Sequence, residues 1–139
     1  MSLYLLLFLA AFATAFTQQE SNKEQGIPKK ALEAFRKSYP TATIKKFDME
    51  RIQGKIAVKI ESMEGTSTRV VAYDTLGTVL TSREPIAPTD LPPKIRASID
   101  NVYPRRSIER AEKLMENGTS RYEVYLKLLY DSNGEEIVK

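Results

Sequence analysis

Apolar residues recur at helical spacing in two stretches of this chain. Between Pro28 and Pro40, and again between Pro92 and Pro104, they lie three and four positions apart, with charged residues on the opposite face. A proline suits the first turn of a helix, because its missing N–H would have no partner there, and a residue before a proline is biased away from the helical region. The pattern therefore predicts one helix inside each pair of prolines.

The two stretches repeat each other at a constant offset. Three landmarks are each displaced by 64 positions: Pro28 and Pro92, Tyr39 and Tyr103, and Ile44 and Ile108. Such regularity is typical of an internal repeat. The sequence predicts a first repeat over residues 26–82, a connector over 83–90 and a second, shortened repeat over 91–139. At equivalent positions of the two helices, Phe35 and Ile99 are expected to face a sheet, and Arg36 and Asp100 to face solvent.

After each Tyr-Pro pair the apolar period changes to alternation, which favours strands. The first repeat is expected to hold strands at residues 42–47, 56–60, 69–73 and 78–80, with a polar loop over 62–68. In the second, residues 107–115 predict a strand, Asn117-Gly118 a hairpin turn and residues 122–130 an uninterrupted alternating run. Here either one long strand replaces two or the sheet is smaller. The predicted fold class is α+β, in which each helix covers an antiparallel meander.

Both repeats contain an Asp-x-x-Gly turn. Asp74 and Asp131 can accept backbone N–H groups, and Gly77 and Gly134 can take the left-handed conformation. A calcium loop would need several further oxygen ligands at fixed spacing. All four residues are therefore interpreted as structural turn residues, and no metal or cofactor is expected.

The first fifteen residues carry no charged side chain and end in Ala13-Thr14-Ala15, the small-x-small form that signal peptidase accepts. They are predicted to be a signal peptide, so that the mature chain starts at Phe16 and is periplasmic or secreted. Residues 16–25 are expected to form a flexible leader. An uncleaved anchor or a buried helix is the alternative, but the apolar run falls short of the roughly 20 residues needed to span a bilayer.

The composition excludes several kinds of chemistry. The chain contains no His, Cys or Trp, which removes imidazole and thiolate nucleophiles, bases and metal ligands. Glu109, Glu112 and Glu116 are spaced like a solvated strand edge rather than a converging catalytic pair. With 21 basic and 18 acidic residues, the net charge of +3 is far from the clustered basic footprint of a nucleic-acid-binding protein. No enzymatic activity is predicted.

Taken together, these motifs resemble a known family. A helix opened by Ile/Leu-Pro and closed by Tyr-Pro, an alternating strand and a Tyr-Asp-x-x-Gly turn, given twice behind a signal peptide, resemble the PepSY-like proteins. These exported bacterial proteins, common in Bacteroidetes, are also described as β-lactamase-inhibitor-like (BLIP-like). The resemblance covers residues 26–139 and implies helices packed on an antiparallel sheet and binding rather than catalysis. The inhibitor label is a fold-level analogy and does not itself imply an activity.

Candidate contact residues for a partner are aromatic and basic. Tyr39 and Tyr103 could be exposed recognition aromatics, although a Tyr at a helix end more often caps the core. The basic pairs Lys45-Lys46 and Arg105-Arg106 could form a contact surface, although such pairs are usually solvated. Thr75 fits a short Asp-Thr-aliphatic pattern of O-glycosylation in exported Bacteroidetes proteins. The favoured function is a small protein-binding or inhibitory module acting on another exported protein. The alternative is a structural or envelope-accessory protein without a discrete enzyme target.

Overall fold

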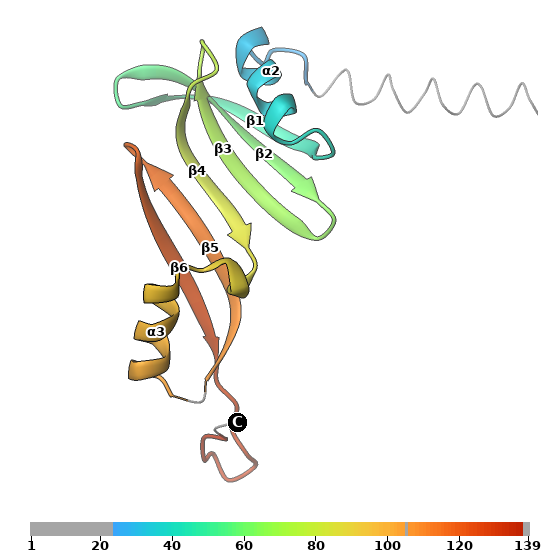
Figure 1. The fold of residues 1–139 in the computed structure, drawn as a ribbon. Coiled ribbons are helices and arrows are strands. Elements are labelled where there is room, and N and C mark those ends of the chain that lie inside the picture. The colour runs from blue at the N-terminus through green and yellow to red at the C-terminus, as the bar shows by residue number, and fades with distance from the viewer. Residues whose placement is uncertain (1–23, 105, 138–139) are drawn as a thin grey trace, which may run out of the picture. The chain divides into compact units, whose positions relative to one another are not determined.

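A computed structural model describes residues 24–104 and 106–137 of the chain, so the expected signal peptide and nearly all of the expected leader lie outside the described residues. The chain divides into two compact units, the first ending at Leu80 and the second beginning at Thr81. Six strands form an antiparallel sheet in the order β1-β2-β3-β4-β5-β6 (Figure 1). The elements are α2 (Lys29–Ser38), β1 (Thr43–Ile52), β2 (Lys55–Glu64), β3 (Ser67–Asp74), β4 (Val79–Ile86), the 3₁₀ helix η1 (Pro88–Asp90), α3 (Pro93–Val102), β5 (Ser107–Glu116) and β6 (Thr119–Lys127).

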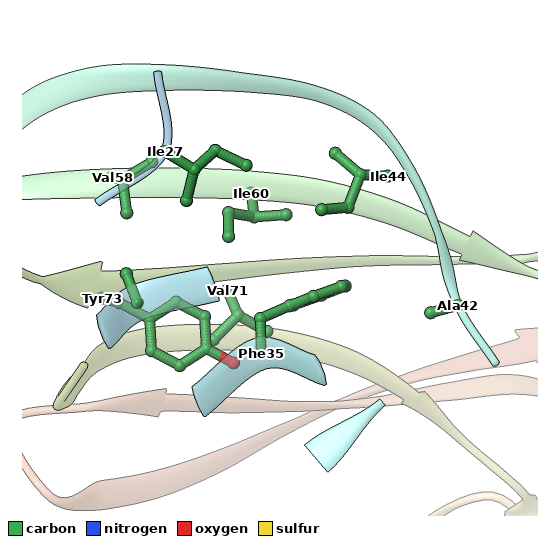
Figure 2. Close-up of a cluster of buried hydrophobic side chains, with 9 residues drawn as sticks. Ile27, Phe35, Ala42, Ile44, Val58, Ile60, Val71 and Tyr73 are labelled. Carbon is green, nitrogen blue, oxygen red and sulfur yellow. The ribbon is translucent and has the colours of Figure 1, made fainter. Parts of the chain in front are cut away.

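The helix of the first unit covers its strands as the apolar spacing predicts. Pro28 precedes α2 and accepts a hydrogen bond from the N–H of Leu32, and Tyr39 closes the helix by donating to Phe35. Ala31 and Phe35, one turn apart on one face of α2, are fully buried. They pack in a cluster with Ile27 before α2, with Ala42 before β1, and with alternate strand residues (Figure 2): Ile44, Val58, Ile60, Val71 and Tyr73.

Two strand boundaries differ from the prediction. The polar stretch 62–68 was expected to be a loop, but β2 and β3 pair across it and only Gly65 and Thr66 lie between the strands. Ser62, opposite Arg69, is fully buried. The polar residues lie in an extended hairpin, because backbone pairing continues wherever two strands remain adjacent, whatever their side chains.

The fourth strand is also longer than predicted. β4 continues to Ile86, so residues 83–86 of the expected connector are strand, paired with β5 from Arg83 opposite Leu114 to Ile86 opposite Ala111. Pro85, in the expected connector, lies within this strand. A proline lacks only its own N–H, and a strand tolerates it where that donor is not needed.

In the second unit, the helix and first strand lie 64 positions after those of the first: α3 after α2 and β5 after β1. A register irregularity also falls at the same offset, between Ile44 and Lys46 in β1 and between Ile108 and Arg110 in β5. Asn117-Gly118 forms the predicted hairpin turn, with both residues at positive φ. The predicted alternating run ends as a strand at Lys127, and in the described residues an isolated bridge between Tyr130 and Glu136 follows. One nine-residue strand, β6, therefore follows β5, and it joins the same six-stranded sheet as the strands of the first unit.

The second helix buries far less than predicted. No residue of α3 is buried, and Ile99 is only half-buried. Asp100 is exposed, as expected, but the prediction for Arg36 is wrong. The Arg36 side chain is 33% exposed and donates from Nη1 to the carbonyl oxygen of Ala42 at 2.7 Å. A long arginine side chain can bend back from an outward position to reach a backbone acceptor. None of the helices in the described residues is long and apolar enough to cross a membrane.

Candidate protein-interaction surface

Tyr39 lies at the rim of the first core rather than on an open surface. Its ring is half-buried, with its centroid 5.4 Å from that of Phe35. The guanidinium of Arg69 lies 4.0 Å from the centroid of the Tyr39 ring. Tyr39 is thus held between the core and a cation, which leaves little of the ring for a partner.

The basic residues predicted to contact a partner differ in their surroundings. Lys45 is exposed on β1, while Lys46 forms an ion pair with Glu61 at 3.3 Å. Arg105 lies outside the described residues. Thr75 is exposed, so its hydroxyl is accessible on the surface of the first unit.

The two Asp-x-x-Gly turns have the same hydrogen bonds. Asp74 Oδ1 accepts from the N–H groups of Leu76 at 3.0 Å and Thr78 at 2.9 Å, and Asp131 Oδ1 accepts from the corresponding N–H groups of Asn133 and Glu135. The N–H of Thr78 is the main cause that lowers the pKa of Asp74, against the opposing effect of burial. In the described part of the chain, no cluster of acidic residues could hold a metal ion.

Gly77 also has a packing role. It adopts φ +86°, and a Cβ built on it would lie 2.6 Å from the carbonyl oxygen of Lys30 in α2. Gly134 has a similar φ of +81° but no heavy atom within 4 Å of such a Cβ. The turn of the first unit is therefore packed against its helix, whereas the turn of the second is open.

Tyr103 and Arg106 lie in an exposed cluster at the end of the second unit. Tyr103 is 45% exposed, and the guanidinium of Arg106 lies 5.7 Å from its ring centroid. Arg106 Nη2 also pairs with Glu136 at 2.8 Å, and Glu136 bridges to Tyr130, which is 59% exposed. These contacts connect the end of α3 to the C-terminal turn. We call Tyr103, Arg106 and Tyr130 the tyrosine patch.

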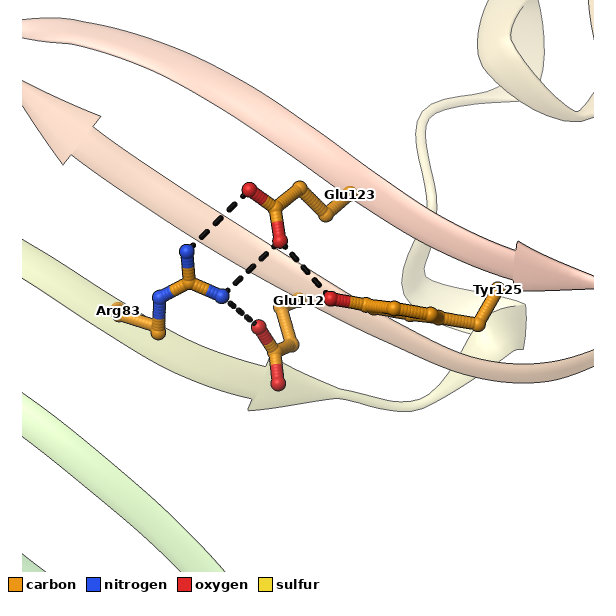
Figure 3. Close-up of polar contacts among 4 residues, drawn as sticks. All are labelled: Arg83, Glu112, Glu123 and Tyr125. Atoms are coloured by element: carbon orange, nitrogen blue, oxygen red, sulfur yellow. Dashed lines mark hydrogen bonds and ion pairs between the residues drawn. The ribbon is translucent and has the colours of Figure 1, made fainter.

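A second polar cluster was missed by the sequence interpretation. On β4, β5 and β6, Arg83 forms a two-pronged pair with Glu123, at 2.9 and 3.2 Å, and also contacts Glu112 (Figure 3). The hydroxyl of Tyr125 donates to Glu123 at 3.0 Å. Hydrogen bonds from Arg83 and then Tyr125 lower the pKa of Glu123. The guanidinium of Arg110 lies 3.8 Å from the centroid of the Tyr125 ring.

A sequence signal for this cluster did exist. Glu112 and Glu123 lie the same number of positions before and after the Asn117-Gly118 turn, so a two-residue hairpin places them opposite each other. Two carboxylates directly opposite each other destabilise a strand pair, so a nearby cation is expected to balance them. Glu112 and Glu116 are engaged by different arginines, Arg83 and Arg121 respectively, so they do not form a converging pair.

The comparisons with known proteins give structural neighbours alone. No protein-family model and no curated protein matches the chain. A BLIP-like protein from Bacteroides fragilis is similar in structure, with a TM-score of 0.47, 15% identity, and coverage of 78% of this chain and 82% of that one. A DUF2874 family protein from Bacteroides uniformis has a TM-score of 0.47 and 15% identity, covering 79% and 86%. The first of these bears the name that the sequence resemblance gives.

Proposed function

We propose that this chain is an exported protein-binding module whose contact surface is the tyrosine patch. The observation that carries the proposal is the exposure of two tyrosines near an arginine. Tyr103 is 45% exposed and lies beside Arg106, and Tyr130, 59% exposed, bridges to Glu136, the ion-pair partner of Arg106. Tyrosine and arginine are enriched in protein interfaces and in the residues that dominate binding energy.

Two further parts of the proposal concern the organisation of the chain. The two units are copies of one repeat, which the shared offset of helices, strands and register irregularities supports. The first copy supplies a core and the second presents the surface. Residues 1–15 are a signal peptide, so protein recovered from the periplasm of a native-like host should have an intact mass starting at Phe16, or at Thr14 if cleavage follows Ala11-Phe12-Ala13.

The partner is another exported protein, and inhibition is the narrower form of the proposal, in which the patch covers a functional surface of that partner. Catalysis is not proposed, because the chain has neither histidine nor cysteine for nucleophilic or general-base chemistry near neutral pH. The alternative, an envelope-accessory protein without a discrete target, makes no use of a defined contact patch.

Site-specific photo-crosslinking in the source organism distinguishes these two readings. A crosslinker at Tyr103 or Tyr130 should capture one partner, and the same group at the exposed Ser67 of the first unit should not. With the captured partner purified, Tyr103→Ala and Tyr130→Ala should each weaken binding by about tenfold or more, the loss expected of a hot-spot residue. The matched change Thr75→Ala should leave the affinity unchanged. Equal capture from all three positions, or equal affinities of all variants, would contradict the tyrosine patch as the contact surface.

A further inference from the structure

β6 is a strand with an open edge. It ends the strand order of the sheet, and β5 is its one strand partner among the described residues. None of its nine side chains is buried, whereas β2, which is paired on both sides, buries Ala57, Val58, Ile60 and Ser62. An open edge presents unpaired N–H and C=O groups and is a template for another strand.

The two edges of the sheet are protected to different extents. β1, at the other end of the strand order, carries a charge at five of its ten positions: Lys45, Lys46, Asp48, Glu50 and Arg51. β6 carries three charges, and its stretch Val124-Tyr125-Leu126 has none. Charged side chains are a common device against edge-to-edge pairing. The composition of β1 therefore disfavours added strands, and that of β6 permits them.

The hairpin fixes which backbone groups of β6 point outward. Asn117 and Gly118, at φ 52° and 72°, form a two-residue turn of the I′ kind, flanked by Glu116 opposite Thr119. That closing pair exchanges both hydrogen bonds, and hydrogen-bonded pairs then alternate along the ladder. Residues 120, 122, 124 and 126 consequently direct their N–H and C=O groups away from β5. These groups are oriented to bond a further strand.

We propose that β6 pairs antiparallel with β6 of a second copy of this chain, centred on Tyr125. In this register Glu123 of each copy lies opposite Lys127 of the other, which gives two opposite-charge pairs on one face. On the other face Val124 lies opposite Leu126, also twice, because side chains alternate between faces. The arrangement is self-complementary, as a two-fold interface requires. It does not use the tyrosine patch, so it stands or falls separately from the proposed function.

A competing register places Tyr122 at the two-fold axis. It sets Arg121 opposite Glu123 and leaves Val124 opposite Ser120. Glu123, which pairs with Arg83 in its own chain, takes part in both registers, so the two registers differ in the cation that they use. Arg121 already pairs with Glu116 at 2.9 Å in its own chain, and an apolar residue gains less from a serine than from a leucine. The register centred on Tyr125 is the better match on both faces.

Engineered cysteines test the register directly, because the natural chain has none. Tyr125→Cys places two thiols at a non-hydrogen-bonded pair, where Cα atoms are about 4.5 Å apart, within the range of a disulfide. Mild oxidation should therefore give a crosslinked dimer from Tyr125→Cys and much less from Tyr122→Cys. Dimer from Tyr122→Cys in preference would overturn the register, and no dimer from either variant would overturn the pairing.

Charge reversal tests the same interface in solution by analytical ultracentrifugation. The unmodified chain should show a concentration-dependent dimer. Lys127→Glu should raise the dissociation constant of this dimer by about tenfold or more, because Glu123 of each copy then lies opposite a glutamate of the other copy. Lys45→Glu, the same change on the charged edge β1, is the matched control and should have no effect. A chain that is monomeric at millimolar concentration, or a control as damaging as Lys127→Glu, would overturn the proposal. If β6 instead paired with an extended segment of another protein, the purified chain would be such a monomer.

Discussion

The helices α2 and α3 have the same length and follow prolines in the same way, but they bury different amounts of surface. α2 places Phe35 and Ala31 in a cluster of nine buried residues, whereas α3 buries nothing and leaves Ile99, the equivalent of Phe35, half-exposed. After Leu80, only Leu91 and Ala111 among the described residues are buried. An amphipathic helix gains its stability from the surface that it covers, so the difference lies in the sheets beneath the helices.

The two helices are also followed by different sets of strands. In the first unit β3 follows β2 and contributes Val71 and Tyr73 to the core. In the second unit β5 and β6 follow α3, and after β6 the described chain forms the open turn of Asp131 and the bridge between Tyr130 and Glu136. Few residues of this unit are buried, and β6 lies at the end of the strand order. Most of the buried core residues therefore lie before Leu80.

Truncating the two equivalent helix residues should give the largest contrast. Phe35→Ala removes a fully buried ring and leaves a cavity, which should lower the free energy of unfolding by about 3–5 kcal/mol. Ile99→Ala removes a half-exposed side chain and should cost about 1 kcal/mol. Denaturant melts followed by far-ultraviolet circular dichroism would measure both, since the chain has no Trp. Equal losses would mean that the second helix covers a core as complete as the first.

The two turn glycines should give the next largest difference. Gly77→Ala forces both a strained φ and a contact with the Lys30 carbonyl, for roughly 2–4 kcal/mol of destabilisation. Gly134→Ala introduces the strain alone, for about 1–2 kcal/mol. The same melts apply. If the two substitutions lowered the free energy of unfolding equally, Gly77 would not be packed closely against α2.

Asp74 should make the free energy of unfolding depend on pH. Its pKa is lowered in the folded chain, chiefly by the Thr78 N–H, so its contribution is present above the unfolded pKa of about 4 and is lost as pH falls through the lower folded value. Melts between neutral and acidic pH should show this decline. Asp74→Asn keeps an acceptor but no charge, so it should flatten the decline and cost about 1 kcal/mol at neutral pH. An unchanged acid limb in Asp74→Asn would assign the decline to other groups.

The sequence predicted backbone features better than it predicted burial. Prolines, the Asn117-Gly118 pair and the Asp-x-x-Gly motifs act locally, through φ restriction and side-chain caps, and the helices and turns lie where these residues indicate. Strand lengths were underestimated at Ser62 and Pro85, because ladder pairing depends on a neighbouring strand that composition does not reveal.

The residues of the candidate surface likewise differ in how far local sequence determines their contacts. Tyr103 and Arg106 were predicted from the sequence as contact residues. The structure places them together because both follow the C-terminal end of α3. Tyr39 satisfies the same local pattern but packs on Phe35, since β1, β2 and β3 complete the core below it. Arg83 could not be selected, because its partners on β5 and β6 are distant in sequence and meet it only through strand order.

The smallest contrast concerns the residues next to Phe35 and Ile99. Arg36 donates to the Ala42 carbonyl at 2.7 Å and also contacts Glu24, so it ties α2 to the segments before and after it. Its side chain is 33% exposed, which reduces the value of the ion pair, and Arg36→Ala should cost about 1 kcal/mol. Asp100, at the equivalent position of α3, is exposed, and Asp100→Ala should change stability by less than about 0.5 kcal/mol. Arg36→Lys serves as a control, because it keeps the charge but not the geometry of the guanidinium, and it should recover only part of the loss. If Asp100→Ala were as costly as Arg36→Ala, α3 would be held by contacts like those of α2, and the contrast between the two units would be smaller than their burial indicates.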